Sequence, residues 1–159
     1  MTTSISRSIL VAIPELCTGC RICEIRCAFR HYRRYNPSRA RIRVARTDET
    51  GLDVPGACRQ CGKCPVIAVC PTSAIFRDER TGAVVLVEEK CNGCGLCIDA
   101  CPFHTVFIDP TTKLAINCDL CGGEPECVKQ CPTKAIQYVP IEKATKLTKP
   151  IPAWAPKKE

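Results

Sequence analysis

The sequence has few aromatic residues and no long apolar run. Phe, Trp and Tyr make up 5% of the 159 residues, and thirteen prolines interrupt the chain, so a large apolar core is not expected. No segment approaches the ~20 apolar residues of a membrane span. Residues 9–13 are apolar, but Pro14 follows and the small-residue cleavage site of a signal peptide is missing. This run fits a first β-strand better than an export signal.

The sequence lacks the residues that several functional classes require. The two histidines, His31 and His104, lie outside any Cys-x-His pattern, which argues against a Rieske centre. We expect both at surface or loop positions. The chain shows no Ser/His/Asp, paired-carboxylate or phosphate-loop constellation and no recognition-helix pattern for nucleic acid. We therefore predict neither substrate chemistry in this chain nor a nucleic-acid partner.

Cysteine, by contrast, is abundant: sixteen residues, about a tenth of the chain. They form four groups of four, with none outside: Cys17, Cys20, Cys23 and Cys27; Cys58, Cys61, Cys64 and Cys70; Cys91, Cys94, Cys97 and Cys101; Cys118, Cys121, Cys127 and Cys131. Proline follows the last cysteine of groups two, three and four. The pattern indicates one unit used four times.

The cysteine spacing predicts cubane [4Fe–4S] clusters. In Cys-x-x-Cys-x-x-Cys, one tight loop carries three thiolates to three corners of a cubane, and the fourth corner needs a cysteine from elsewhere. Glycines between the ligands let the backbone approach the sulfurs. A zinc ribbon has two Cys pairs a dozen or more residues apart, and a disulfide scaffold rarely repeats one spacing four times. We predict that all sixteen cysteines ligate iron in four [4Fe–4S] clusters.

Groups two and four depart from the usual spacing, with five residues between Cys64 and Cys70 and five between Cys121 and Cys127. A [3Fe–4S] cluster is the alternative in either group, if one ligand fails to reach the metal. We expect [4Fe–4S] because all four cysteines are present in both groups.

The net charge is consistent with these cofactors. The formal charge is +7 with every cysteine counted as neutral. An oxidised [4Fe–4S] core on four thiolates contributes about −2, so four sites turn +7 into about −1. The basic excess therefore offsets the clusters and gives little reason to expect nucleic-acid binding.

Between the cysteine groups the sequence predicts short elements. Hairpins are expected at 74–77 with 83–88 and at 106–108 with 114–116, each around a turn-rich segment. Residues 41–46 alternate and are expected to pair with 9–13 or with the following segment. Short helices are expected at 23–31, 96–100 and 127–131. The last residues, rich in Pro and Lys, predict an extended arm.

Taken together, these motifs resemble a known family, the four-cluster, ferredoxin-like electron-transfer subunits of complex oxidoreductases. The resemblance covers residues 10 to about 139. It is carried by the four cysteine groups, by Asn36-Pro-Ser-Arg-Ala-Arg-Ile-Arg-Val44, and by the Cys118-Asp-Leu-Cys…Pro-Glu-Cys-Val-Lys-Gln-Cys-Pro motif. Group two departs from the family's Cys-x2-Cys-x4-Cys-x3-Cys-Pro pattern: its third cysteine, Cys64, comes two residues early and Val66 stands where a ligand is expected.

The family implies an α+β fold of two nested bacterial-ferredoxin-like halves, with short strands and short helices around four clusters. It implies a double domain over residues 1–140, with one half from about 9–48 plus 105–140 and the other from about 52–104, and an arm at 141–159. Carried over, the ligand sets are Cys17, Cys20 and Cys23 with Cys131; Cys118, Cys121 and Cys127 with Cys27; Cys58, Cys61 and Cys64 with Cys101; and Cys91, Cys94 and Cys97 with Cys70. Sequential pairing, group one with two and three with four, remains the alternative.

The implied function is a relay of single electrons between a catalytic subunit, with a tungsten or molybdenum pterin, and a redox partner such as a flavin subunit or a soluble ferredoxin. The chain is most similar to the small iron–sulfur subunit of a tungsten aldehyde oxidoreductase. Alternatives are a free-standing polyferredoxin and a subunit of a carbon monoxide dehydrogenase or hydrogenase. Reduced thiols and the lack of an export signal favour the cytoplasm.

Overall fold

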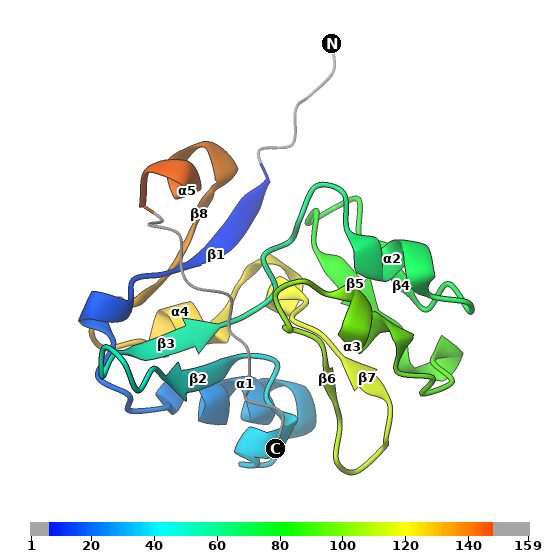
Figure 1. Ribbon diagram of the computed structural model, residues 1–159, viewed down its shortest axis with the longest axis horizontal. Helices are drawn as coiled ribbons and strands as arrows, with labels where there is room; N and C mark the ends of the chain where they lie inside the picture. Colours follow the sequence, from blue (N-terminus) through cyan, green and yellow to red (C-terminus); the bar gives the residue numbers. More distant parts are fainter. Residues whose placement is uncertain (1–6, 148–159) are drawn as a thin grey trace.

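The computed structural model describes residues 7–147, which form short strands and short helices in an α+β arrangement (Figure 1). In chain order the elements are β1 (Ser8–Ala12), η1 (Pro14–Leu16), α1 (Ile22–Tyr32), η2 (Pro37–Arg39), β2 (Arg43–Arg46), β3 (Asp53–Gly56), α2 (Pro65–Val69), β4 (Ile75–Arg77), β5 (Val84–Leu86), η3 (Glu88–Lys90), α3 (Leu96–Ala100), β6 (Phe107–Ile108), β7 (Ala115–Ile116), η4 (Leu120–Gly123), α4 (Glu126–Gln130), β8 (Ile136–Pro140) and α5 (Ile141–Leu147). Within these residues, none of the helices has the length and apolar character that crossing a bilayer requires.

The strands form four two-stranded antiparallel sheets within the described chain. Three are local hairpins, β2–β3, β4–β5 and β6–β7, and the last two confirm the predicted hairpins. Local turn chemistry explains them: in the β4–β5 turn Asp78 accepts hydrogen bonds from Thr81 and from the Arg80 N–H, and Gly82 takes the left-handed conformation with φ +70°. Strand β2 pairs with β3, the following segment, rather than with β1.

The fourth sheet joins the two ends of the chain. Strand β1, expected from the apolar run at 9–13, pairs with β8 with Leu10 opposite Tyr138. Helix α1 packs against α4, and α2 packs against α3. Segments before residue 35 and after residue 118 therefore lie side by side, next to a second layer of elements from the middle of the chain (Figure 1).

Two placements differ from the expected boundaries of the halves. Strand β3 falls within the expected second half but pairs with β2. The β6–β7 hairpin was expected in the first half, yet Val106 and Ala115 pack with Val66, Ile75 and Val84 in the core of the middle segment. The β2–β3 and β6–β7 hairpins are both closed by short local turns. The half to which each hairpin belongs is therefore decided by the surface against which it packs.

The expected extended arm is wrong for residues 141–147, which form helix α5. This stretch, Ile-Glu-Lys-Ala-Thr-Lys-Leu, contains no proline, and its buried Ala144 faces β1 and β8. The Ile141 N–H donates to the Arg7 carbonyl oxygen at 2.9 Å. The helix propensity of residues 141–147 and their packing on β1 and β8 favour a helix, and the prolines of the expected arm begin only at Pro150. The rest of the expected arm, 148–159, lies outside the described residues.

Thiols make up much of the core. One group of buried residues combines Cys23, Cys27 and Cys127 with Ile42 and Val44. A second packs Cys97 and Cys101 against aliphatic side chains from α2, β4 and β5. A third, smaller group joins Cys58 to Cys118 through Ala83 and Leu120. The cysteine groups are therefore the interior around which the short elements are arranged.

Candidate iron–sulfur sites

The structure brings the sixteen thiols together as four sets of four. We name them outer set A (Cys17, Cys20, Cys23, Cys131), inner set B (Cys27, Cys118, Cys121, Cys127), inner set C (Cys58, Cys61, Cys64, Cys101) and outer set D (Cys70, Cys91, Cys94, Cys97). Set A lines one small cavity and set C lines another. In set B, Cys27 is a close neighbour of Cys121 and Cys127. In set D, Cys97 is a close neighbour of Cys70, Cys91 and Cys94.

The long-range pairings create these sets. Strand β8 starts five residues after Cys131, and its pairing with β1 carries that cysteine to the loop of Cys17. The packing of α1 on α4 places Cys27 beside Cys127. In the middle segment, α2 on α3 places Cys70 beside Cys97 and Cys64 near Cys101. Each set thus takes three thiols from one cysteine group and its fourth from the end of another.

The electrostatics of the sets favour a bound cation. Burial above all, together with the nearby Glu24 carboxylate and two thiols of set A, raises the pKa of Cys23 to about 12. Burial likewise raises the pKa of Cys27 to about 11, and Cys121 adds to the effect. Four thiolates this close repel one another in a medium of low polarity. Iron coordination removes the repulsion, because the metal core supplies the missing positive charge.

The cysteines that precede proline have a different local environment. Burial acts to raise the pKa of Cys131, but hydrogen bonds from backbone N–H groups and from the Thr133 hydroxyl lower it overall. Cys70 has the same net lowering, with Thr72 as its hydroxyl donor. The S···O distances are 3.8 Å to Thr133 and 3.6 Å to Thr72. The cysteine spacing gave no prediction for these threonines, although Cys-Pro-Thr occurs in both groups.

Backbone groups also point at the sulfurs, as a cluster site requires. The Arg41 N–H donates to Cys27 Sγ at 3.3 Å, and the Gln60 N–H to Cys58 Sγ at 3.4 Å. Gly19, between two thiols of set A, has φ +67°, and a Cβ there would lie 2.5 Å from a carboxylate oxygen of Asp53. Glycine adopts this left-handed conformation without strain, whereas a Cβ there would force the Asp53 side chain to move. The thiol sets, cavities and N–H donors therefore fit [4Fe–4S] clusters.

The four sets follow one another in the order A, B, C, D. Cys23 of set A is a neighbour of Cys127 of set B. Cys58 of set C is a neighbour of Cys118 of set B. Sets C and D share one core. The two exposed thiols among the sixteen belong to the outer sets, Cys20 to A and Cys94 to D.

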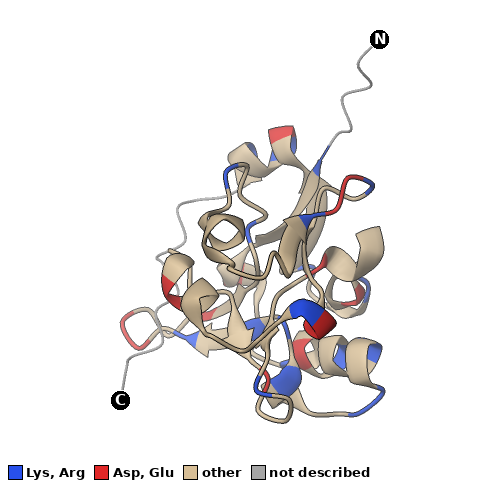
Figure 2. Ribbon diagram, turned by 90° about the vertical axis from the view of Figure 1, so that its right-hand side faces the viewer, with Lys and Arg blue, Asp and Glu red and all other residues tan. Residues whose placement is uncertain are grey.

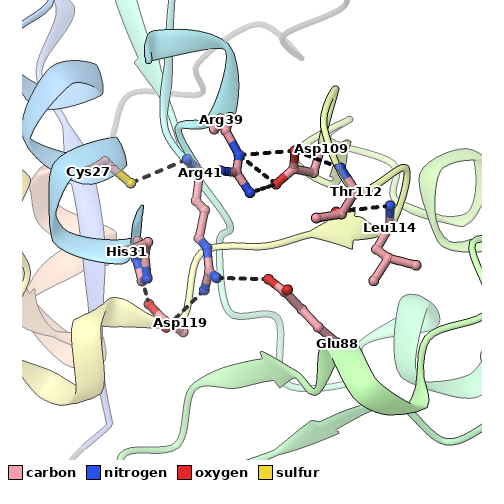
Figure 3. Close-up of polar contacts among 9 residues, drawn as sticks. All are labelled: Cys27, His31, Arg39, Arg41, Glu88, Asp109, Thr112, Leu114 and Asp119. Carbon is pink, nitrogen blue, oxygen red and sulfur yellow. Dashed lines mark hydrogen bonds and ion pairs between the residues drawn. The ribbon is translucent and has the colours of Figure 1, made fainter. Parts of the chain in front are cut away.

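Polar contacts beside set B were not foreseen (Figure 3). The Arg41 guanidinium lies 2.9 Å from Asp119 and 3.9 Å from Glu88. His31 Nε2 lies 3.5 Å from Asp119, and its side chain is only 12% exposed. The expectation of a surface or loop histidine is therefore wrong for His31, because its place on α1 turns it towards Asp119 at the start of η4. His104 does lie in a loop, after Cys101.

A second ion pair links distant segments. Arg39 Nη2 lies 2.6 Å from Asp109, whose carboxylate is fully buried and also accepts from the Thr112 N–H at 3.3 Å (Figure 3). The Thr111 N–H donates to the same carboxylate at 2.8 Å. The Arg39 guanidinium stacks 3.6 Å from the centre of the Tyr32 ring. Elsewhere, residues of both signs are dispersed over the surface (Figure 2).

Comparison with known proteins agrees with this description. The family model of a 4Fe-4S dicluster domain matches residues 50–140, and that of a 4Fe-4S binding domain matches residues 14–30. The chain is 42% identical over 132 residues to the polyferredoxin-like subunit of the aliphatic sulfonate oxidoreductase of Pyrococcus furiosus, covering 82% of this chain and 76% of the relative. It is 30% identical over 156 residues to PhsB, the electron transfer subunit of thiosulfate reductase from Salmonella typhi, covering 90% and 78%.

Two further likenesses are more partial. The chain is 36% identical to NrfC of Escherichia coli, covering 81% of this chain but only 63% of that protein. A chain of the active site complex BamBC of benzoyl coenzyme A reductase superposes with a TM-score of 0.49 at 28% identity, covering 83% of this chain and 75% of that one. The Pyrococcus and Salmonella relatives match over most of the chain and are named as a polyferredoxin-like subunit and an electron transfer subunit. The chain therefore belongs to the family of [4Fe–4S] ferredoxin-like electron-transfer subunits of oxidoreductase complexes.

Proposed function

We propose that the chain holds four [4Fe–4S] clusters, one on each of sets A, B, C and D. The observation that carries the proposal is the sorting of sixteen thiols into four sets, with no cysteine left over. For the ligands we adopt the nested pairing that the resemblance to the family implies. When bound, such clusters each accept and release one electron at a time. The protein's own part is to hold the thiols, to donate N–H groups to sulfur and to exclude water from the inner sets.

We further propose that the two outer sets face two different redox partners. Sets B and C have no exposed thiol, whereas Cys20 and Cys94 reach the surface. Exposed apolar side chains flank both: Leu16 and Ile22 near Cys20, and Leu96 near Cys94. An apolar surface of this kind is typical of the centre of a protein–protein interface. A subunit with two such ends relays electrons between partners.

The partner at one end is a catalytic oxidoreductase subunit, for which we propose a tungsten or molybdenum pterin. The sequence resemblance to tungsten aldehyde oxidoreductase subunits supports aldehydes as substrates, and the name of the Pyrococcus relative adds aliphatic sulfonates as a second class. We also predict a cytoplasmic location and, as the second partner, a flavin subunit or a ferredoxin. The alternative functions are a free polyferredoxin and a subunit of a carbon monoxide dehydrogenase or hydrogenase.

The ligand pairing is tested by comparing single Cys→Ser variants, purified without oxygen. Nested pairing predicts that Cys131→Ser alters the same cluster signal in electron paramagnetic resonance spectra of the reduced protein as Cys20→Ser does. Sequential pairing predicts instead that Cys131→Ser alters the same signal as Cys94→Ser, because Cys131 would then be the fourth ligand of the cluster on group three. Cys20→Ser and Cys94→Ser are matched controls, since both remove an exposed thiol from an outer set.

The partner is tested by elemental analysis of the native complex, recovered through a tag on this chain. About sixteen iron atoms per chain are expected from the four sites, with extra iron and tungsten or molybdenum from the co-purifying subunit. Nickel would identify a carbon monoxide dehydrogenase or hydrogenase partner, and a lone chain with iron alone would identify a free ferredoxin. Zinc in place of iron would overturn the proposed clusters.

A further inference from the structure

Two buried amide side chains lie between the inner sets. Gln60 is fully buried and stands between Cys58 and Cys61 of set C. Asn117 is 2% exposed and directly precedes Cys118 of set B. Burying a primary amide is costly unless its polar atoms are paired. Their contacts therefore indicate what these two side chains do.

Both amides bind the main chain of one residue, Val84 in β5. The Val84 N–H donates to Gln60 Oε1 at 2.6 Å, and Asn117 Nδ2 donates to the Val84 carbonyl oxygen at 3.0 Å. Gln60 Nε2 donates in addition to the Cys118 carbonyl oxygen at 2.9 Å. The two side chains thus act like a neighbouring strand along the free edge of β5. They tie the ligand loops of sets B and C to one another.

Asn117 has a further role that Gln60 does not share. Its side chain lines the cavity of set C together with Cys58 and Cys101. A primary amide carries two N–H groups, and only one is taken by Val84. Cys58 lines the same cavity, so the second N–H is available to its sulfur.

The other end of the Asn117 amide is left without a partner. Its Oδ1 is buried and has no hydrogen-bond partner among the described residues. An unsatisfied buried acceptor costs about 1–3 kcal/mol, and leucine has nearly the same shape without this cost. The amide therefore lowers stability unless both of its N–H groups are used, and one of them remains available at the cavity that Cys58 lines.

We propose that Asn117 sets the reduction potential of the cluster on set C by donating an N–H to Cys58, and that Gln60 is only a structural tie between sets B and C. The inference rests on the proposed four-cluster function. A hydrogen bond to a ligand sulfur stabilises the more electron-rich state of a cluster, so it raises the reduction potential. Asn117 therefore makes the set C cluster easier to reduce than its burial alone would allow.

The test compares Asn117→Leu with Gln60→Leu in anaerobic redox titrations followed by electron paramagnetic resonance. Asn117→Leu is expected to retain about sixteen iron atoms and to lower one of the four potentials by about 59 mV, a tenfold change in a one-electron equilibrium constant. Gln60→Leu removes a buried amide from the same network but leaves both donors to Cys58, so it should leave the potentials nearly unchanged. Asn36→Leu is the remote control, because Asn36 only caps η2 at the surface.

A second measurement decides the matter if Asn117→Leu fails to fold. Asparagine labelled with ¹⁵N in the side-chain amide is incorporated into protein that keeps Asn117, and hyperfine spectroscopy searches for ¹⁵N coupled to a reduced cluster. The background is Asn92→Asp, which keeps the acceptor for the Cys94 N–H but removes the other amide near a ligand loop. A coupled ¹⁵N is expected. Its absence, or equal potentials in Asn117→Leu and the unsubstituted protein with all iron retained, would overturn the role of Asn117 while leaving the four clusters in place.

Discussion

Replacing Arg39 by methionine removes the counter-charge of a buried carboxylate. Asp109 is fully buried, and Arg39 Nε and Nη2 lie 2.8 and 2.6 Å from its Oδ2. The pair joins η2 to the turn of the β6–β7 hairpin, seventy positions away. Methionine keeps a long apolar side chain over Tyr32, so the substitution tests mainly the lost charge and hydrogen bonds.

The expected cost is large for a single substitution. Removing one partner of a buried ion pair costs about 3–5 kcal/mol because the other charge stays buried. The N–H groups of Thr111 and Thr112 still donate to Asp109, so we expect the lower end, about 3 kcal/mol. The double variant Arg39→Met/Asp109→Asn should recover much of this loss, because no buried charge remains in it.

The loss of stability caused by Arg39→Met should not vary with pH near neutrality. Burial would raise the pKa of Asp109, but hydrogen bonds from Arg39 and from two backbone N–H groups lower it overall. A carboxyl with a lowered folded-state pKa contributes stability that is present above its unfolded pKa of about 3.9 and is lost as the pH falls through the folded value. The stability that Asp109 contributes in the unsubstituted protein should therefore be fully present above about pH 5 and be lost only as the pH falls below about 4.

The assay is the rate at which the visible cluster absorbance is lost in urea without oxygen, because unfolding with loss of iron is irreversible. About 3 kcal/mol corresponds to about a 100-fold faster loss, if the pair forms after the transition state for folding. Lys129→Met removes the exposed pair of Lys129 with Glu124 and should change the rate little. A rate within about threefold of the unsubstituted protein for Arg39→Met would refute the reasoning.

Two further predictions concern the clusters as part of the core. Removing iron should leave the chain largely unfolded, because thiols form much of the interior; circular dichroism with native-like intensity after iron removal would contradict this. Gly19→Ala should lower the iron content, because the new Cβ would meet the Asp53 carboxylate at 2.5 Å. Gly51→Ala is its matched control, since Gly51 has the same φ of +67° with nothing within 4 Å, so equal iron loss in both would point to backbone strain alone.

The local parts of the molecule followed from the sequence. The cysteine spacing predicted cubane ligation because three of the thiolates lie on one short loop, and loop geometry is a property of neighbouring residues. The β4–β5 and β6–β7 hairpins followed from turn residues such as Asp78 and Gly82. In each case the interacting groups are a few residues apart, so the chain has little freedom in how they meet.

Group two shows where local reasoning ended. The early Cys64 and the valine at the expected ligand position left its geometry open. In the structure, Pro65 begins helix α2, and Val66 is buried in the core beside Cys97 and Cys101. A proline at the first helical position favours this start, but only the packing of α2 on α3 decides which side chains of the helix face inward.

Tertiary structure alone decided which distant groups meet. The neighbours Cys17 and Cys131 depend on β1 pairing with β8, and helix α5 at 141–147 depends on the surface those strands offer. The Arg39–Asp109 pair and the contact of Asn117 with set C also join segments far apart in sequence. Such contacts carry no local signature, because their free energy comes from burial and hydrogen bonding between surfaces that exist only after the chain has folded.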